Sequence, residues 1–503
     1  MGIIINQSIK STFSYYIGMI IGAVNTVILY PIIFNDKPEY LGLIQILIAY
    51  SLIFSTFSHL SLPSIIVKYF PYIKLKGQLF LFSFILSSMG FIIFCFFFYL
   101  FLNNFINNMT EATLLLDYSY YIIPLVFFIS FSDVLNALSR SYLDSSTPIF
   151  LNEVFLKIYS LIFLIVYGQG FIDFDLFLKI YFMGYLLKFL ILLVVQLYYN
   201  RLYFEFDTSA LQIKKMLKFG LFVILGSTSA LLISKVDMLM LASYLDLENV
   251  AYYSIAFYIG NAIMIPARSI NSISTPIVAN AWKSNDIELI GNIYYKSSIN
   301  QLILGGVFFL CIWSNIDNIM LILHNFSPKF SGGRYVVLFI ALARVVHLVS
   351  GVNSSIIINS RYYKFDLLSN IPFLIFIVIT NYFLIPGDLK ILGIPISGIN
   401  GAACATFISS FLFFAIRIIF VYSKFKIHPF SINTLKIISL LFVLYLLSIN
   451  VNFNFNLYTN IILKSGIILL IFIPSIYVMK ISTDINNLLL ISIKRINLFL
   501  FKI

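Results

Sequence analysis

Residues 216–241 read MLKFGLFVILGSTSALLISKVDMLML, an apolar stretch long enough to cross a lipid bilayer. The stretch nevertheless contains Lys235 and Asp237, and a run of small and polar residues at 226–229 near its middle. Ionisable residues inside a membrane are costly and usually serve a function. The stretch lies near the middle of the 503 residues and resembles the first apolar stretch, so it divides the chain into two comparable halves.

The composition excludes a soluble globular protein. Hydrophobic residues make up 61% of the chain, charged residues 10%, and the mean hydropathy is +0.99. The chain is therefore predicted to be a polytopic membrane protein. The first apolar run, 12–34, is too long for a signal-peptide core and lacks an A-x-A cleavage site, so it is expected to remain as a span. The three cysteines lie in apolar runs without ligand spacing, and no disulfide or metal site is predicted.

Apolar runs of roughly 20 residues predict fourteen spans and an all-α fold. The predicted spans are 12–34, 41–66, 79–102, 119–139, 148–168, 176–198, 216–241, 250–275, 298–314, 335–357, 367–386, 395–420, 436–452 and 461–479. The longest predicted connections are a cytoplasmic loop at 276–297 and an external loop at 315–334, and both are too short to form a domain.

The distribution of basic residues predicts the orientation, because Lys and Arg near span ends are retained on the cytoplasmic side. With the N-terminus inside, the cytoplasmic side collects 21 of the 32 Lys and Arg residues, and the opposite side six. Both termini are therefore predicted to be cytoplasmic. This topology and the anionic lipid headgroups account for the net charge of +12, so membrane lipids are expected partners and nucleic acid is not.

A weak repeat relates the two halves. In each half a span is followed by a short acidic external loop, and Glu39 leads into EYLGLIQILIAYSLIF as Glu248 leads into VAYYSIAFYIGNAIMI. Six spans precede the end of each half, which predicts a parallel repeat. The predicted domains are an N-terminal lobe at 1–198, a cytoplasmic linker at 199–215, a C-terminal lobe at 216–420, two additional spans within 421–479, and a cytoplasmic interfacial tail at 480–503.

Residues 381–406 read NYFLIPGDLKILGIPISGINGAACAT. This resembles the multidrug/oligosaccharidyl-lipid/polysaccharide (MOP) exporter superfamily, in which a span ending in Asn-x-x-Leu-Ile-Pro precedes a span beginning Gly-x-x-Gly-Ala-Ala-x-Ala-Thr. The matching positions are Asn381, Leu384, Ile385, Pro386, Gly398, Gly401, Ala402, Ala403, Ala405 and Thr406. With fourteen spans, the chain looks most like the Wzx-type flippases of lipid-linked oligosaccharides. The resemblance implies two lobes that work by alternating access. The small residues themselves are expected to pack helices closely.

Eight ionisable residues fall inside the predicted spans, where each costs about 2.5–3.5 kcal/mol. Five are cations and three are acids: Asp133, Glu153, Lys157, Lys188, Lys235, Asp237, Arg268 and Arg344. Lys235 and Asp237 lie about 200° apart around a helix and cannot pair. Glu153 and Lys157 are spaced i and i+4, which fits a structural pair as well as a functional site. Lys188 lies among apolar residues and is expected to snorkel or to pair helices.

Buried cations without catalytic apparatus suit the transport of an anion, and a polyprenyl diphosphate carries its charge at the headgroup. The expected cationic cavity, in the gap between the halves, uses Lys157, Lys235, Arg268 and Arg344, with Arg140 and His347 as secondary candidates. Coupling to H⁺ or Na⁺ is assigned to Asp133, Asp237 and Glu153, with structural salt bridges as the equally weighted alternative. No other cofactor is expected.

The predicted function is a flippase, not an enzyme, that moves a polyprenyl-diphosphate-linked oligosaccharide across a bacterial inner membrane. The glycan would serve O-antigen, capsule or exopolysaccharide synthesis, and other polysaccharide assembly proteins are potential partners. One alternative is a cation-coupled multidrug antiporter of the same superfamily. The other is a membrane glycan polymerase or ligase, although such enzymes resemble one another in having one long external loop, which this sequence lacks.

The charge asymmetry yields a topological prediction. Reporter fusions after Lys215 and Lys426 are expected to report the cytoplasm, and a fusion within 103–118 the outside, because basic residues are retained inside. Paired alkaline phosphatase and green fluorescent protein fusions measure this. A cytoplasmic signal from the fusion within 103–118 would overturn the orientation.

Overall fold

The computed structural model describes residues 2–73, 76–106, 112–202, 212–391, 393–449, 455–487 and 490. Within these residues, 13 helices are long and apolar enough to cross a membrane. A fourteenth span results when α16 (Arg334–Val349) and α17 (Asn353–Asn359), which meet at a 50° bend, are counted together. The all-α fold and the number of spans are confirmed. The chain forms two compact units, residues 1–255 with 365–405 and residues 256–364 with 406–503.

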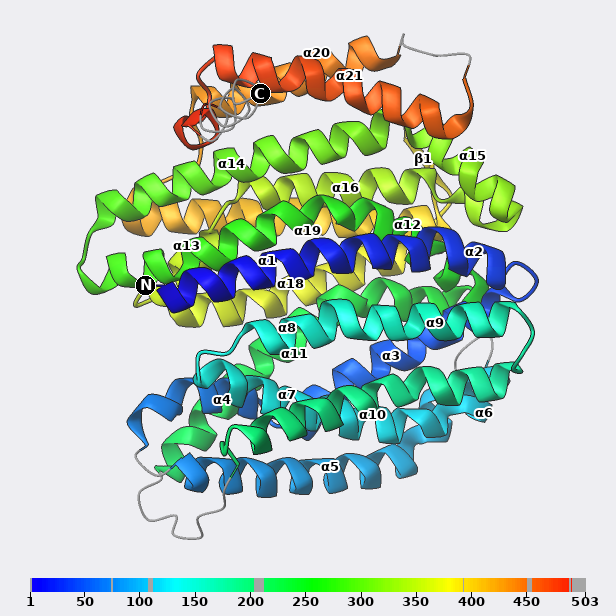
Figure 1. The fold of residues 1–503 in the computed structure, drawn as a ribbon, viewed down its shortest axis with the longest axis vertical. Coiled ribbons are helices and arrows are strands. Elements are labelled where there is room, and N and C mark those ends of the chain that lie inside the picture. The colour runs from blue at the N-terminus through cyan, green and yellow to red at the C-terminus, as the bar shows by residue number, and fades with distance from the viewer. Residues whose placement is uncertain are drawn as a thin grey trace, which may run out of the picture. The chain divides into compact units, whose positions relative to one another are not determined.

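The first unit contains the helices of the N-terminal half (Figure 1). Its first nine α-helices are α1 (Gly2–Ala23), α2 (Tyr30–Ile33), α3 (Pro38–Ser58), α4 (Leu62–Tyr69), α5 (Lys76–Ile106), α6 (Ala112–Tyr118), α7 (Ile122–Ser141), α8 (Ser146–Phe150) and α9 (Leu156–Gly168). It continues with α10 (Phe174–Tyr198), α11 (Ile213–Tyr244), most of α12 (Leu247–Asn261), nearly all of α18 (Tyr363–Leu384) and the start of α19 (Gly398–Phe425). Short helical segments are the π-helices η1 (Val24–Leu29) and η4 (Leu151–Phe155), and the 3₁₀ turns η2 (Phe70–Tyr72) and η3 (Ser119–Tyr121).

At the centre of the first unit, α7 packs against α3, α4 and α10, and α3 also packs against α11 (Figure 1). In the membrane spans that contain α3 and α7, most residues of the apolar segment are buried, whereas in α5 and α10 most are not. Exposed apolar helix faces suit contact with lipid tails. The centre of this unit is therefore the α3–α7 pair, and most polar residues of these two helices are buried within the unit.

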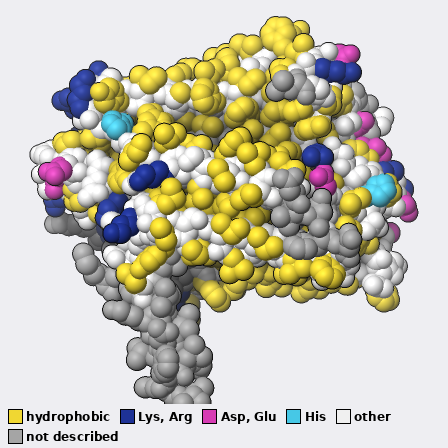
Figure 2. Space-filling model, turned by 90° about the horizontal axis from the view of Figure 1, so that it is seen from above, with side chains coloured by type: hydrophobic (Ala, Val, Ile, Leu, Met, Phe, Trp, Pro, Cys, Tyr) yellow, Lys and Arg dark blue, Asp and Glu magenta, His cyan; other side chains and the backbone are white. Residues whose placement is uncertain are grey.

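The second unit contains α13 (Ile265–Lys283), α14 (Ile287–Ser314), α15 (Ile316–Phe326), α16, α17, most of α19, α20 (Ile432–Ile449) and α21 (Leu457–Val478), with the 3₁₀ turns η5 (Ala262–Met264) and η6 (Pro328–Gly332). The added helices α20 and α21 pack on each other and on α14. Their outer surfaces carry exposed Leu435, Phe442, Ile462 and Leu470. Figure 2 shows apolar side chains across the middle of the visible face and charged ones toward its two ends, the pattern of a helix layer that meets lipid.

The prediction of a cytoplasmic loop at 276–297 is wrong. Helix α13 continues through Lys283, and α14 begins at Ile287. The turn is made by Asn285, whose φ is +55°, and by Asp286, whose carboxylate accepts the Leu289 amide at 2.8 Å. Such side-chain capping starts a helix without any apolar signal, so hydropathy placed the end of α13 too early and the start of α14 too late. The external segment 315–334 contains α15 and η6 and forms no separate domain.

The region from Asn381 to Thr406 owes its residue types to close packing. Asn381 lies in α18, whose end is followed by a hairpin of β1 (Leu389–Ile391) and β2 (Ile394–Ile396), and α19 starts at Gly398. Gly398 has a φ of +52° and donates its amide to the Ile385 carbonyl at 2.8 Å. A Cβ on Gly401 would lie 2.1 Å from the carbonyl oxygen of Leu384. The predicted packing role is confirmed, since Ala402, Ala403 and Ala405 are also fully buried.

Parts of several predictions lie outside the described residues. They include Lys74, Lys494 and Arg495 among the basic residues, positions 107–111 of the external fusion site, much of the linker at 199–215, and most of the tail at 480–503. In the tail, residues 483–487 are helical. The predicted domain boundaries and the parallel repeat stay predictions.

The contact at Gly401 can be tested by substitution. Gly401→Ala is expected to destabilise the protein by about 1–3 kcal/mol, because the new methyl group meets backbone atoms that cannot move aside. Gly466→Ala is the matched control, since Gly466 lies inside α21 and a Cβ there would have no neighbouring atom within 4 Å, and alanine favours a helix by about 0.5–1 kcal/mol. Thermal unfolding of the purified protein in detergent measures both. Equal midpoints for the two variants would contradict the close approach.

Candidate functional site

A break in the second span creates the main polar site of the first unit. Helix α3 ends at Ser58, and α4 starts at Leu62 with a proline in its first turn. Between them, Leu60 and Ser61 adopt left-handed backbone angles, with φ of +49° and +56°. Non-helical backbone at membrane depth is stable only where protein buries it or where it lines a wet cavity. Here the break lines a cavity.

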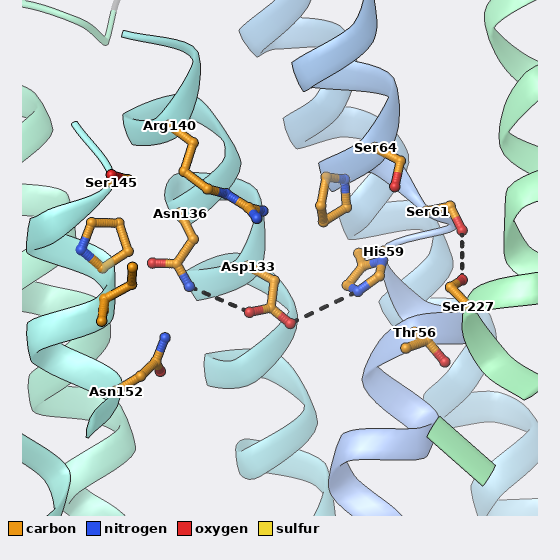
Figure 3. Close-up of a pocket in the computed structure, with 13 residues that line it drawn as sticks. Thr56, His59, Ser61, Ser64, Asp133, Asn136, Arg140, Ser145, Asn152 and Ser227 are labelled. Carbon is orange, nitrogen blue, oxygen red and sulfur yellow. Dashed lines mark hydrogen bonds and ion pairs between the residues drawn. The ribbon is translucent and has the colours of Figure 1, made fainter. Parts of the chain in front are cut away.

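Helix α7 forms the opposite wall of this cavity. Its polar residues Asp133, Asn136 and Arg140 follow i, i+3, i+7 spacing and therefore share one face of the helix. Figure 3 shows their side chains and His59 converging on the same space. The cavity has a volume of about 360 Å³. It is lined by Thr56, His59, Ser61, Pro63, Ser64, Asp133, Asn136, Arg140, Ser145, Pro148, Ile149, Asn152 and Ser227.

The polar atoms in the cavity are only partly satisfied by one another. His59 Nε2 lies 3.9 Å from Asp133 Oδ2, and Asn136 Nδ2 donates to Asp133 Oδ1 at 3.4 Å. His59 and Asn136 are each only 6% exposed. His59 Nδ1 and Asn136 Oδ1 have no hydrogen-bond partner within the described part of the chain. Buried polar atoms normally have a partner, so the cavity has hydrogen-bonding capacity for a bound molecule or for water.

The π-helix η4 contributes Asn152 to the cavity wall and holds Glu153 beside α1. Glu153 and Lys157 form the predicted i, i+4 pair, with Nζ 3.0 Å from Oε2. Lys157 also donates to the Gly18 carbonyl at 3.0 Å. A Cβ on Gly18 would lie 2.3 Å from the Glu153 carbonyl oxygen, so only glycine permits this approach. Glu153 and Lys157 therefore form the structural ion pair that their spacing allowed.

Asp237 forms a second polar centre in the same unit. Tyr253 donates its hydroxyl to Asp237 Oδ2 at 2.5 Å, and Asn381 Nδ2 donates to Oδ1 at 2.8 Å. The carboxylate thereby joins α11, α12 and α18.

In the second unit, Arg344 lies over the Phe257 ring at 5.4 Å, and His347 stacks on Phe414 with ring centroids 4.4 Å apart. Arg268 is exposed on α13. The 3₁₀ turn η5 precedes α13, whose first turn contains Pro266, so the α-helical hydrogen bonding of the eighth predicted span is interrupted next to a proline.

The sequence analysis missed two buried cations of the described part of the chain, Lys464 in α21 and Arg417 in α19. Arg417 in α19 is 2% exposed and donates from Nη2 to Ser354 Oγ at 3.0 Å and from Nε to Asn353 Oδ1 at 3.3 Å. Asn353 in turn donates to the Tyr294 hydroxyl at 2.7 Å. Arg417 lies near the end of a predicted span, where a basic residue is assigned to the cytoplasmic side.

The structure brings two of the predicted residues, Asp133 and Arg140, into one cavity. The Asp237 cluster forms a separate centre within the first unit, and Lys157 is neutralised by Glu153. His59, Asn136 and Asn152 were not predicted. The sequence did contain signals for the first two. For His59, the signal is the stretch HLSLPS at 59–64, which places polar residues and a proline inside a predicted span. For Asn136, it is the helical spacing of Asp133, Asn136 and Arg140.

The Asp237 cluster makes a prediction that two adjacent tyrosines can test. Tyr253→Phe is expected to destabilise the protein by about 1.5–3 kcal/mol, because it removes a buried hydrogen bond to a carboxylate. Tyr252→Phe is the control: its hydroxyl donates to Glu248 at 3.0 Å at a half-buried site, where water can replace it. Thermal unfolding in detergent compares the two, and a Tyr252→Phe effect as large as that of Tyr253→Phe would contradict the assignment.

Two family models match the sequence. The model described as "Polysaccharide biosynthesis protein" matches residues 5–282, more than half of the chain. The model described as "MatE" matches residues 223–383. No curated protein matches the sequence.

Solved structures with the same fold cover most of the chain. "Lipid II flippase MurJ, inward closed conformation" is similar with a TM-score of 0.69 and 16% identity, over 95% of this chain and 100% of that one. An inward-facing multidrug resistance MATE family transporter of the MOP superfamily gives a TM-score of 0.61 at 14% identity, over 82% and 98% of the two chains. An outward-facing MATE structure gives 0.56 at 15% identity, over 84% and 95%. At these identities the likeness shows the fold, which is that of the MOP superfamily.

Proposed function

The chain belongs to the polysaccharide biosynthesis protein family, and we propose that it is a flippase for a lipid-linked glycan. The observation that carries the proposal is the polar cavity of about 360 Å³ lined by residues of the apolar, membrane-spanning helices. Polar residues inside the membrane line the routes of polar cargo. A glycan on a lipid carrier needs such a route for its head, while its tail stays in the bilayer.

The likeness to a lipid II flippase over nearly the whole chain supports the same kind of cargo, a glycan on a polyprenyl diphosphate. Solved relatives of the fold include inward-facing and outward-facing structures, which supports transport by alternating access. We place the protein in a bacterial inner membrane with both termini in the cytoplasm. Its product would serve the synthesis of O-antigen, capsule or exopolysaccharide, alongside other polysaccharide assembly proteins.

For the diphosphate we retain the predicted cations Lys157, Lys235, Arg268 and Arg344 as ligands. Lys157 and Lys235 belong to the first unit, and Arg268 and Arg344 to the second. Because Lys157 is bonded to Glu153 and Gly18, its substitution would disturb packing as well as binding. The two arginines therefore make the cleaner test, since their guanidinium groups can each bind two phosphate oxygens.

A drug/cation antiporter is the alternative, favoured by the MatE match and by the buried carboxylate of Asp237. In either function, Asp237 is our candidate for binding the coupling ion, H⁺ or Na⁺. Its carboxylate accepts hydrogen bonds from Tyr253 and Asn381, and a change in its charge would alter the junction of three helices. Asp133 remains a second candidate. Glu153, already paired with Lys157, is the weakest of the three.

The function is tested by reconstitution into liposomes. The protein is expected to move a lipid-diphosphate glycan between leaflets, and Arg268→Ala or Arg344→Ala to slow this by about tenfold or more through loss of a charge-assisted phosphate contact. Arg361→Ala, an exposed arginine in the connection between α17 and α18, is the control and should transport at the parental rate. A leaflet-specific reagent that modifies the glycan gives the readout.

Expression in a strain without its own drug pumps separates the two candidates. We expect no gain of resistance to cationic dyes. Dye resistance that disappears with Asp237→Asn, together with no lipid movement in liposomes, would decide for the antiporter. Lipid movement at the parental rate in both arginine variants would support the flippase function. It would also show that Arg268 and Arg344 are not phosphate ligands.

A further inference from the structure

We propose that the cavity between the α3–α4 break and α7 is a carbohydrate subsite that holds a sugar ring of the transported glycan. This inference rests on the proposed function and deepens it, because it assigns the sugar part of the cargo to residues separate from the predicted diphosphate ligands. Arg140 was considered above only as a secondary phosphate ligand, and His59, Asn136 and Asn152 had no predicted role.

The chemistry of the cavity wall favours a ligand that both donates and accepts hydrogen bonds. Ten of the 13 lining residues are polar, and all ten are labelled in Figure 3. Asp133 and Asn136 Oδ1 are acceptors, whereas Arg140 offers only donors. A bare phosphate would satisfy the donors alone, and a bare cation the acceptors alone. Sugar hydroxyls satisfy both kinds of group, since each can donate one bond and accept others.

Two side chains of the cavity wall carry buried, unsatisfied polar atoms. His59 Nδ1 and Asn136 Oδ1 lack hydrogen-bond partners among the described residues, although both side chains are more than nine-tenths buried. Leaving a buried polar group unsatisfied costs about 1–3 kcal/mol. A hydroxyl group can meet His59 Nδ1 in either tautomer, because it accepts from a protonated nitrogen and donates to an unprotonated one.

Size and placement fit one or two sugar rings. The volume of about 360 Å³ lies at the small end of the range of ligand pockets, about 300–1,000 Å³. The walls come from α3, α4, α7, α8, η4 and α11, all within the first unit. Asn152 reaches the cavity from a π-helix, a local irregularity that is frequent at binding sites. The cavity is therefore a built pocket that exists within a single unit.

Two lipid probes test the subsite with the full-length protein in nanodiscs. One is bare undecaprenyl diphosphate, and the other is the lipid-linked glycan extracted from the strain in which this gene is deleted. The parent protein is expected to bind the glycan-bearing lipid more tightly than the bare lipid. Asn136→Leu and His59→Phe are expected to weaken binding of the glycan-bearing lipid about tenfold, while affinity for undecaprenyl diphosphate stays unchanged.

Further variants keep the test decisive. Asn280→Leu, an exposed asparagine on α13, is the matched control and should behave as the parent. If Asn136→Leu does not fold, as judged by size-exclusion chromatography, Asn152→Ala replaces it, because Asn152 is exposed at the cavity wall. If the variants lose affinity equally for both lipids, or lose it for neither, the carbohydrate subsite is wrong, but the proposed flippase function is not contradicted. A parent protein that binds neither lipid would overturn the proposed function and the subsite with it.

Discussion

The fold is governed by the need to satisfy every backbone amide and carbonyl group in a solvent that offers no hydrogen bonds. Helices meet this need within a single segment, and for that reason nearly all of the described chain is helical. The exceptions are informative. The break between α3 and α4 lies against the polar side chains of α7, and the two π-helices of the first unit contain buried Asn25 and half-buried Glu153. Departures from the α-helix thus occur where polar chemistry is available.

The buried charges follow a related rule. Asp237 receives hydrogen bonds from a phenol and an amide, and Arg417 donates to an amide and a hydroxyl. Neutral partners of this kind stabilise a charge, and each contributes about 1.5–3 kcal/mol. Such partners do not themselves cancel the charge. Lys157 differs, because Glu153 cancels its charge locally.

The spans were predictable because their signal is a running average over many residues, which tolerates single polar positions. The cavity was harder to predict, because it depends on which side chains of α3, α7 and η4 face one another. Asp133 and Arg140 were identified because they are ionisable residues inside or near a span. Asn136 is neutral, and only its helical spacing from Asp133 pointed to it. His59 was assigned no role. The helix ends around Asn285 were misplaced because a polar, capped turn has no hydropathy signal. Arg417 was overlooked because a basic residue near a span end is assigned to the cytoplasm.

The hydrogen bond between Asp237 and Asn381 joins residues that are 144 positions apart. At about 5–20 residues per second, the ribosome reaches Asn381 roughly 7–30 s after Asp237. During that interval Tyr253, only 16 residues after Asp237, is the nearer of these two hydrogen-bond partners in the sequence. The first unit also awaits residues 365–405, which follow most of the second unit in the sequence. The contacts of the first unit can therefore be completed only after most of the second unit has been synthesised.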